Sequence, residues 1–308
     1  MRIKAEIFLI LIIIAIFTFV LYQGIEFSKT SISSPTPFPE KSLSKPEVLV
    51  SSDILEQGDT LLVKVNTDTE VNKVSGELGS TKIDFFQSET EGSWVGIAGI
   101  SPKQKPEEYN LVINLANGEE LKKELTIIER KFPIVGLPVT EVYTPSKISE
   151  TLSEDKPVLN QIFSVYTPEV YFKKAFIYPL KEFKIVGAYG VIRQSGNFGY
   201  QHLGVDLEAE IGTPVYALND GEVLLSENLS SYGKTLIIDH GLGIFSFYCH
   251  LSEFKVSKGE KVKKGDIIAL SGDSGYATEP HLHLTIKVNG SSVDPLRFIE
   301  TIKKEMVK

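Results

Sequence analysis

Cysteine and histidine are scarce in this sequence, and each absence excludes a class of site. Cys249 is the only cysteine among 308 residues, so the chain cannot form an intramolecular disulfide. No histidine precedes His202, which excludes a catalytic or metal-binding histidine from the first 201 residues. A long basic run is also missing and the formal net charge is −8. We therefore expect no nucleic-acid partner, because phosphate contacts require clustered lysine and arginine.

A long apolar run stands near the N-terminus. Residues 7–22 contain no charge and no proline, and Arg2 and Lys4 precede them. With its apolar neighbours the run reaches roughly the 20 residues that cross a bilayer, and no small-x-small cleavage site follows it. We therefore expect residues 1–27 to be an uncleaved membrane anchor, with a cleaved signal peptide as the alternative. The two positive charges predict a single-pass protein of the cell membrane, with its N-terminus inside and the rest of the chain extracytoplasmic.

Two segments of different composition follow the anchor. Residues 28–46 are rich in serine, threonine, proline and lysine and have few apolar side chains, so an extended linker is expected. Residues 47–129 contain short apolar runs between turn signals. In residues 109–115 apolar and polar side chains mostly alternate, which is the period of a strand with one buried face, and Asn117-Gly118 is a hairpin signal. About seven short strands in this length predict an immunoglobulin-like β-sandwich. Trp94 could bind a sugar, but burial in the core is preferred.

Residues 130–175 are expected to connect this domain to the next. Three prolines at 133, 138 and 145 leave no room for a long element before about residue 146. A helix is predicted to begin around 153–157, where cap residues and an early proline precede the apolar side chains of residues 158–163. A spacer helix that packs on a neighbouring domain is the preferred interpretation. The alternative is a helix that lies over a cleft and inhibits it.

All five histidines lie in the C-terminal part of the chain: His202, His240, His250, His281 and His283. The segment otherwise has the short apolar runs and turn residues of β structure. In residues 281–288 the side chains alternate strictly, so the apolar ones point into a core and both His281 and His283 point to the opposite face. Two imidazoles are therefore expected to face one cavity.

These residues are suited to a metal site. A catalytic zinc ion takes three nitrogen or oxygen ligands from the protein and leaves one position open. His202 and Asp206, four residues apart, offer one ligand of each kind, and either His283 or His281 offers the third. The helical motif His-Glu-x-x-His is absent, which excludes that class of metalloprotease.

Residues 176–299 resemble the LytM or lysostaphin-type zinc endopeptidases, peptidase family M23. The resemblance rests on seven segments in the family's order: His202-Leu203-Gly204-Val205-Asp206-Leu207, Gly212-Thr213-Pro214-Val215-Tyr216-Ala217, Gly221-Glu222-Val223, Ile238-Asp239-His240-Gly241, Tyr248-Cys249-His250-Leu251-Ser252, Val262-Lys263-Lys264-Gly265-Asp266 and Pro280-His281-Leu282-His283. It implies an antiparallel β catalytic domain with the duplicated hybrid motif, so the chain as a whole is expected to be mainly β. It also implies hydrolysis of peptide bonds in bacterial peptidoglycan, either in the stem peptide or in the cross-bridge.

The resemblance assigns roles to particular residues. It implies one Zn²⁺ ion held by His202, Asp206 and His283, with His250 and His281 as the catalytic histidines. Tyr200 is the nearest candidate for the family's oxyanion-stabilising tyrosine, although its offset from His202 differs. His240 is expected to be structural. Cys249 is expected to be a small buried side chain, Asp239 and Asp273 to be turn or supporting residues, and Glu279 to alter a loop where relatives carry glycine.

Two other functions stay open. The first is a relative without activity that binds the wall and activates another hydrolase, and the second is a lipoyl-like carrier or periplasmic adaptor, because residues 262–266 resemble the hairpins of those folds. The inactive relative is disfavoured because this sequence retains all the expected metal ligands. The carrier or adaptor is disfavoured because it leaves the five histidines unexplained. The partners expected are peptidoglycan peptides and the cytoplasmic membrane, with a regulatory protein as a candidate partner of residues 47–129. Residues 300–308 are expected to be a C-terminal tail.

Overall fold

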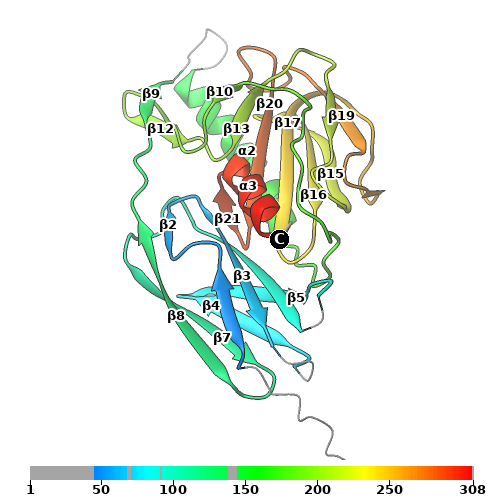
Figure 1. Ribbon diagram of the computed structural model, residues 1–308. Helices are drawn as coiled ribbons and strands as arrows, with labels where there is room; N and C mark the ends of the chain where they lie inside the picture. Colours follow the sequence, from blue (N-terminus) through cyan, green and yellow to red (C-terminus); the bar gives the residue numbers. More distant parts are fainter. Residues whose placement is uncertain (1–44, 68–70, 91, 138–143, 307–308) are drawn as a thin grey trace, which may run out of the picture. The chain divides into compact units, whose positions relative to one another are not determined.

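The computed structural model describes residues 45–67, 71–90, 92–137 and 144–306 (Figure 1). The expected anchor at residues 1–27 and nearly all of the expected linker at 28–46 lie outside these residues. In the part of the chain that is described, no helix is both long enough and apolar enough to cross a membrane.

The N-terminal β domain consists of eight strands where the sequence predicted about seven. They pair in the order β1-β3-β6-β5-β4-β7-β8-β2. Strand β5 pairs with β6 on one side and with β4 on the other, so the strands enclose a single apolar core. The bounds are β1 Glu47–Val50, β2 Ile54–Glu56, β3 Thr60–Asn66, β4 Val74–Leu78, β5 Thr81–Gln87, β6 Ser93–Gly99, β7 Glu108–Leu115 and β8 Glu120–Ile128.

The sequence signals of this domain act as expected. Strands β7 and β8 form a hairpin whose turn carries Gly118 at φ 88°, a left-handed conformation that glycine adopts without steric strain. Leu111 and Ile113 point into the core, in agreement with the predicted alternation. Trp94 is 8% exposed and belongs to the same core, so its predicted burial is confirmed.

The connection contains a longer helix than the sequence indicated. After β9 (Ile134–Gly136), helix α2 runs over Pro145–Phe163, so the predicted start at 153–157 was wrong. Thr144 is the N-cap and its side chain accepts from the backbone N–H of Lys147, while Pro145 occupies the first turn. Proline is favoured there because the first-turn N–H has no helical partner to lose. Pro157, taken as a start signal, lies inside the helix.

The C-terminal domain is built around strand β20, His281–Val288, with the bounds that its alternation predicted. The main sheet has the order β10-β13-β20-β17-β16-β15-β18, so β20 lies between β13 and β17 (Figure 1). Strands β14 and β19 pair with each other, and β21 pairs with β20. The bounds are β10 Ile185–Gly187, β13 Val205–Glu208, β14 Pro214–Tyr216, β15 Gly221–Leu229, β16 Gly233–Asp239, β17 Ile244–Phe254, β18 Lys261–Val262, β19 Ile267–Ser271 and β21 Ser291–Val293. The mainly β fold is thereby confirmed.

A small separate sheet and a final helix complete the domain. The sheet has the order β12-β11-β9, where β11 (Ile192–Ser195) and β12 (Phe198–Gln201) form a hairpin and β9 runs parallel to β11. Helix α3 spans Pro295–Met306, so residues 300–306 are helical and not the expected tail. Phe298, Ile299 and Ile302 are fully buried, because their spacing places them on one helix face against the sheet.

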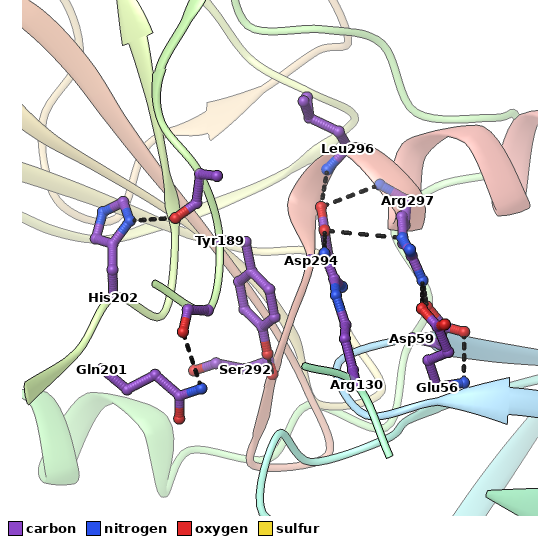
Figure 2. A network of polar contacts seen from close by, with 12 residues as sticks. Glu56, Asp59, Arg130, Tyr189, Gln201, His202, Ser292, Asp294, Leu296 and Arg297 are labelled. Carbon is purple, nitrogen blue, oxygen red and sulfur yellow. Dashed lines mark hydrogen bonds and ion pairs between the residues drawn. The ribbon is translucent and has the colours of Figure 1, made fainter. Parts of the chain in front are cut away.

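The β domain and the C-terminal domain contact each other through a polar network (Figure 2). Arg297 Nη1 donates to Glu56 Oε2 and to Asp59 Oδ1, each at 2.7 Å. Arg130 Nη2 donates to Asp294 Oδ2 at 2.9 Å, and only 19% of the Arg130 side chain is exposed. The two domains are therefore joined by ion pairs, of which Arg130–Asp294 is partly buried, as well as by the connecting segment.

Candidate metal centre

Three side chains from neighbouring elements converge in the C-terminal domain. His202 follows β12, Asp206 lies on β13, and His283 lies on β20 directly opposite Asp206 in the antiparallel register. His202 Nε2 is 3.0 Å from Asp206 Oδ1 and 3.0 Å from His283 Nδ1, and His283 Nδ1 is 2.8 Å from Asp206 Oδ1. All three side chains are buried. Residues separated by 81 positions thus place one ligand atom each in a common space.

The hydrogen bonds around the rings decide which nitrogens face that space. His202 Nδ1 lies 2.9 Å from the carbonyl oxygen of Ala188 (Figure 2). Since a carbonyl can only accept, Nδ1 carries the proton and Nε2 directs its lone pair at the cluster. His283 is turned the other way, with Nε2 at 3.0 Å from Thr285 Oγ1 and Nδ1 in the cluster. His202 Nε2, Asp206 Oδ1 and His283 Nδ1 converge, and two imidazole nitrogens with one carboxylate oxygen are a ligand set suited to zinc.

The protonation states of Asp206 and His283 also favour the binding of a cation. Burial alone would raise the pKa of Asp206, but His202 and His283 outweigh it and bring that pKa well below its usual range. Burial lowers the pKa of His283 to about 4. At neutral pH the site therefore holds one carboxylate and neutral His283, and metal ligands must be in these deprotonated states.

His250 and His281 stand beside this cluster. Their ring centroids are 4.7 Å apart, and the His250 ring is 6.0 Å from the His283 ring. His250 Nδ1 donates to the Ser274 carbonyl and His281 Nδ1 donates to the Glu279 carbonyl, each at 2.8 Å. Both rings thus keep an Nε2 lone pair for a proton. Burial and the neighbouring His281 lower the pKa of His250 to about 3, so it is neutral near pH 7.

The backbone at His250 is irregular. Tyr248 pairs with Leu236 and Leu251 pairs with Lys234, so Cys249 and His250 together oppose Thr235 in a β-bulge. His250 has φ 59°, the left-handed region that a residue with a side chain seldom adopts. Such a conformation costs about 1–3 kcal/mol and persists where the surroundings enforce it. The bulge directs the imidazole toward the cluster while Cys249 stays fully buried, as predicted.

Two residues near the cluster come from the β11–β12 hairpin. Tyr200 lines the same cleft as the histidines. It lies opposite Arg193 in the hairpin register. Arg193 Nη2 donates to Asp206 Oδ2 at 2.6 Å. The sequence analysis missed Arg193 because it lies in no motif. The hairpin turn at Gly196, which has φ 57°, was the signal that could have brought Arg193 beside Tyr200.

Other predicted residues lie outside the cluster. His240 is fully buried, with Nδ1 at 2.7 Å from the Asp220 carbonyl and Nε2 at 2.8 Å from Ser246 Oγ, so its predicted structural role is confirmed. Asp239 accepts from the Gly241 N–H and the Thr167 hydroxyl, as expected of a turn residue. Glu279 belongs to the loop that lines the cleft before His281.

Helix α2 forms part of the cleft wall. Its side chains Ile148 and Leu152 line the cleft together with Tyr232. The buried carboxylate of Asp155 accepts from the backbone N–H groups of Ser230 and Ser231, both at 2.7 Å. The helix is therefore bonded to the loop that carries Tyr232, and it belongs to the structure of the site.

Two imidazoles and one carboxylate lie close enough together to hold a metal ion, and two further imidazoles stand beside them. Residues 200–295 match peptidase family M23, so the chain carries a domain of that family.

Two curated relatives of this domain are endopeptidases according to their names. The peptidoglycan DD-endopeptidase ShyA of Vibrio cholerae serotype O1 is 42% identical over 96 residues, which are 31% of this chain and 22% of that protein. The glycyl-glycine endopeptidase ALE-1 of Staphylococcus capitis is 36% identical over 110 residues, which are 33% of this chain and 30% of that protein. The chain therefore spans less than a third of the length of these two relatives.

A solved structure shares the fold over a longer stretch. A Pseudomonas aeruginosa protein described as a peptidase M23 has a TM-score of 0.58 and 22% sequence identity, and the match covers 80% of this chain and 95% of that one. At this identity the similarity concerns the fold alone.

Proposed function

We propose that this protein is a zinc-dependent endopeptidase that hydrolyses peptide bonds of bacterial peptidoglycan. The observation that carries the proposal is the convergence of His202 Nε2, Asp206 Oδ1 and His283 Nδ1 beside two further imidazoles in an open cleft. The family match of residues 200–295 and the names of the relatives support the reaction class, and the name of ShyA supports the substrate.

The residues would divide the chemistry between them. A zinc ion held by His202, Asp206 and His283 would supply Lewis-acid polarisation of the scissile carbonyl and an acidified water. His250 and His281, each with Nδ1 held by a carbonyl, would accept that water's proton at Nε2 and return it to the leaving amine. A neutral imidazole suits the first of these tasks, and the low pKa of His250 leaves its Nε2 unprotonated. Tyr200, in the same cleft, is the candidate that would stabilise the oxyanion.

We further propose that residues 1–27 anchor the protein in the cell membrane with the catalytic domain extracytoplasmic. The support is the uncharged run at residues 7–22 behind Arg2 and Lys4. An anchor would hold the cleft near peptidoglycan, and residues 47–129 could serve as the surface for a regulatory protein.

The proposal is tested by digestion of purified peptidoglycan with the full chain in detergent, with zinc and with a chelator, followed by mass analysis of the released fragments. Release of peptides that the chelator abolishes is expected, and the new termini would identify the bond. His283→Ala serves as the matched inactive control. Failure to release peptides from several wall types, with zinc bound, would contradict the endopeptidase and favour the wall-binding activator.

A further inference from the structure

The two carboxylate oxygens of Asp206 have different partners. Oδ1 faces His202 Nε2 at 3.0 Å and His283 Nδ1 at 2.8 Å, which places it in the proposed metal site. Oδ2 points away from the histidines and accepts from Arg193 Nη2 at 2.6 Å. Both partners of this ion pair are largely enclosed, with 21% of the Arg193 side chain and 7% of the Asp206 side chain exposed. The pair therefore has little of the solvent screening that weakens surface ion pairs.

Gly187, which has no side chain, leaves room for Asp206 Oδ2. Gly187 on β10 lies opposite Asp206 in the antiparallel register. A Cβ atom at Gly187 would overlap Asp206 Oδ2, so a larger residue there would displace the carboxylate. Gly187 does not have a positive φ, so glycine is not needed here for a left-handed backbone conformation. It is needed because the carboxylate of Asp206 approaches its Cα closely.

Arg193 is held in place by the small sheet. It lies on β11, between Tyr200 of β12 on one side and Val135 of β9 on the other. Strand β9 precedes helix α2, so a segment far from the family match of residues 200–295 supports the strand that carries Arg193. Pairing on both sides fixes the backbone of Arg193, and the hydrogen bond from Nη2 to Asp206 Oδ2 orients its guanidinium.

We infer that Arg193 is a positioning residue that holds the Asp206 carboxylate so that Oδ1 alone is presented to the metal. This inference rests on the proposed zinc site. With Oδ2 occupied by Arg193, the carboxylate binds through one oxygen, and one coordination position stays open for water and substrate. Arg193 also offsets the charge of Asp206, so the bound cation keeps more of its positive charge for the substrate carbonyl. Without Arg193, the carboxylate can rotate and bind through both oxygens.

The experiment replaces the metal with cobalt(II), whose visible absorption is strong in four-coordinate sites and weak in sites of higher coordination. Full-length wild type, Arg193→Met and Arg193→Lys are compared, and zinc affinity is measured by competition with a chelator. We expect wild type to show the strong absorption. Arg193→Met should lose much of it and bind zinc about tenfold more weakly, as is common when a partner of a metal ligand is removed. Arg193→Lys should restore part of both properties, since it retains the charge but not the planar fork.

Two further variants separate this role from a general effect. Lys184→Met removes a positive charge that pairs with Glu208 at 3.2 Å without contacting Asp206, so cobalt absorption and zinc affinity should not change. Gly187→Ala should weaken the cobalt absorption while Arg193 is intact, because the added methyl group moves Oδ2. If wild type binds zinc and Arg193→Met shows the wild-type spectrum and affinity, the positioning role is refuted while the zinc site stands. If wild type binds no zinc, both proposals fail.

Discussion

In the N-terminal β domain the enclosed side chains are nearly all apolar, whereas the C-terminal domain encloses carboxylates and imidazoles as well. Among the described residues, Thr60 is the one buried polar side chain of residues 47–128. The C-terminal domain buries several that ionise: His202, Asp206, Asp239, His240, His250, His283 and Asp294. Helix α2 adds Asp155.

The two domains thus differ in whether ionisable side chains are buried together with the apolar ones. Burial of an ionisable group is costly unless hydrogen bonds replace its water, so such groups persist where they perform a task. In the C-terminal domain some face the cleft and others hold loops, as Asp155 and Asp239 do. The β domain buries no ionisable side chain among the described residues 47–128, so its stability should depend chiefly on apolar packing.

The largest effect is expected from substitutions in the candidate metal centre of the C-terminal domain. His283→Ala removes a ligand atom from the cluster and should abolish zinc retention after dialysis. His250→Ala should retain zinc but lower turnover by about 10²–10⁴-fold, because a proton acceptor is lost and the ligands are not. Metal content and peptide release are measured on the same samples. Equal zinc loss in both variants would contradict the division between ligands and catalytic histidines.

The next variant tests the β domain. Leu111 is fully buried, so Leu111→Ala should lower the free energy of unfolding by about 3–4 kcal/mol through lost burial and a cavity. Zinc affinity should be unchanged, since the residue lies in the separate core of residues 55–127. Urea unfolding gives the stability, and Val112→Ala, on the half-buried face of the same strand, is the control with the smaller loss. A loss of zinc binding would show that the two domains are not independent in this respect.

Removal of the buried carboxylate of α2 is expected to lower the free energy of unfolding somewhat less than Leu111→Ala does. Asp155→Ala leaves the N–H groups of Ser230 and Ser231 without their acceptor and should cost about 3 kcal/mol or less. Turnover should also fall, because the released loop carries Tyr232 of the cleft wall. Glu154→Ala, which changes the exposed neighbour, is the control. A rise in peptide release on Asp155→Ala would instead support the inhibitory helix.

The smallest expected effect concerns pH and a histidine outside the site. Burial lowers the pKa of His240 to about 4, below the value near 6.5 of an unfolded chain. The unfolded chain therefore binds this proton first as pH falls, so the stability contributed by neutral His240 is present above pH 6.5 and is lost toward pH 4. His240→Gln should reduce this loss by about 2 kcal/mol at pH 5, measured by urea unfolding at several pH values with a chelator present. An unchanged pH dependence would refute the low pKa.

Sequence reasoning succeeded where a short local pattern determines the structure. Strand β20 has the predicted bounds because alternation over eight residues is sufficient to place His281 and His283 on one face. It failed where distant segments decide the outcome. The pairing of Arg193 with Asp206 depends on how a hairpin folds over the sheet, and no local pattern encodes that contact. The start of α2 was misplaced because Pro145 and Pro157 carry the same local signal, and tertiary packing selects between them.

The left-handed backbone conformation of His250 affects which residues can replace it without a loss of stability. Glycine has no steric penalty at φ 59°, and asparagine has a small one, whereas other residues lose about 1–2 kcal/mol. Under the proposed mechanism, a lineage that keeps the reaction must retain histidine here despite that loss. A lineage that abandons the reaction gains stability by drifting to glycine or asparagine at this position. If His250 has the proposed catalytic role, the residue found at this bulge in a related sequence indicates whether that protein retains the reaction.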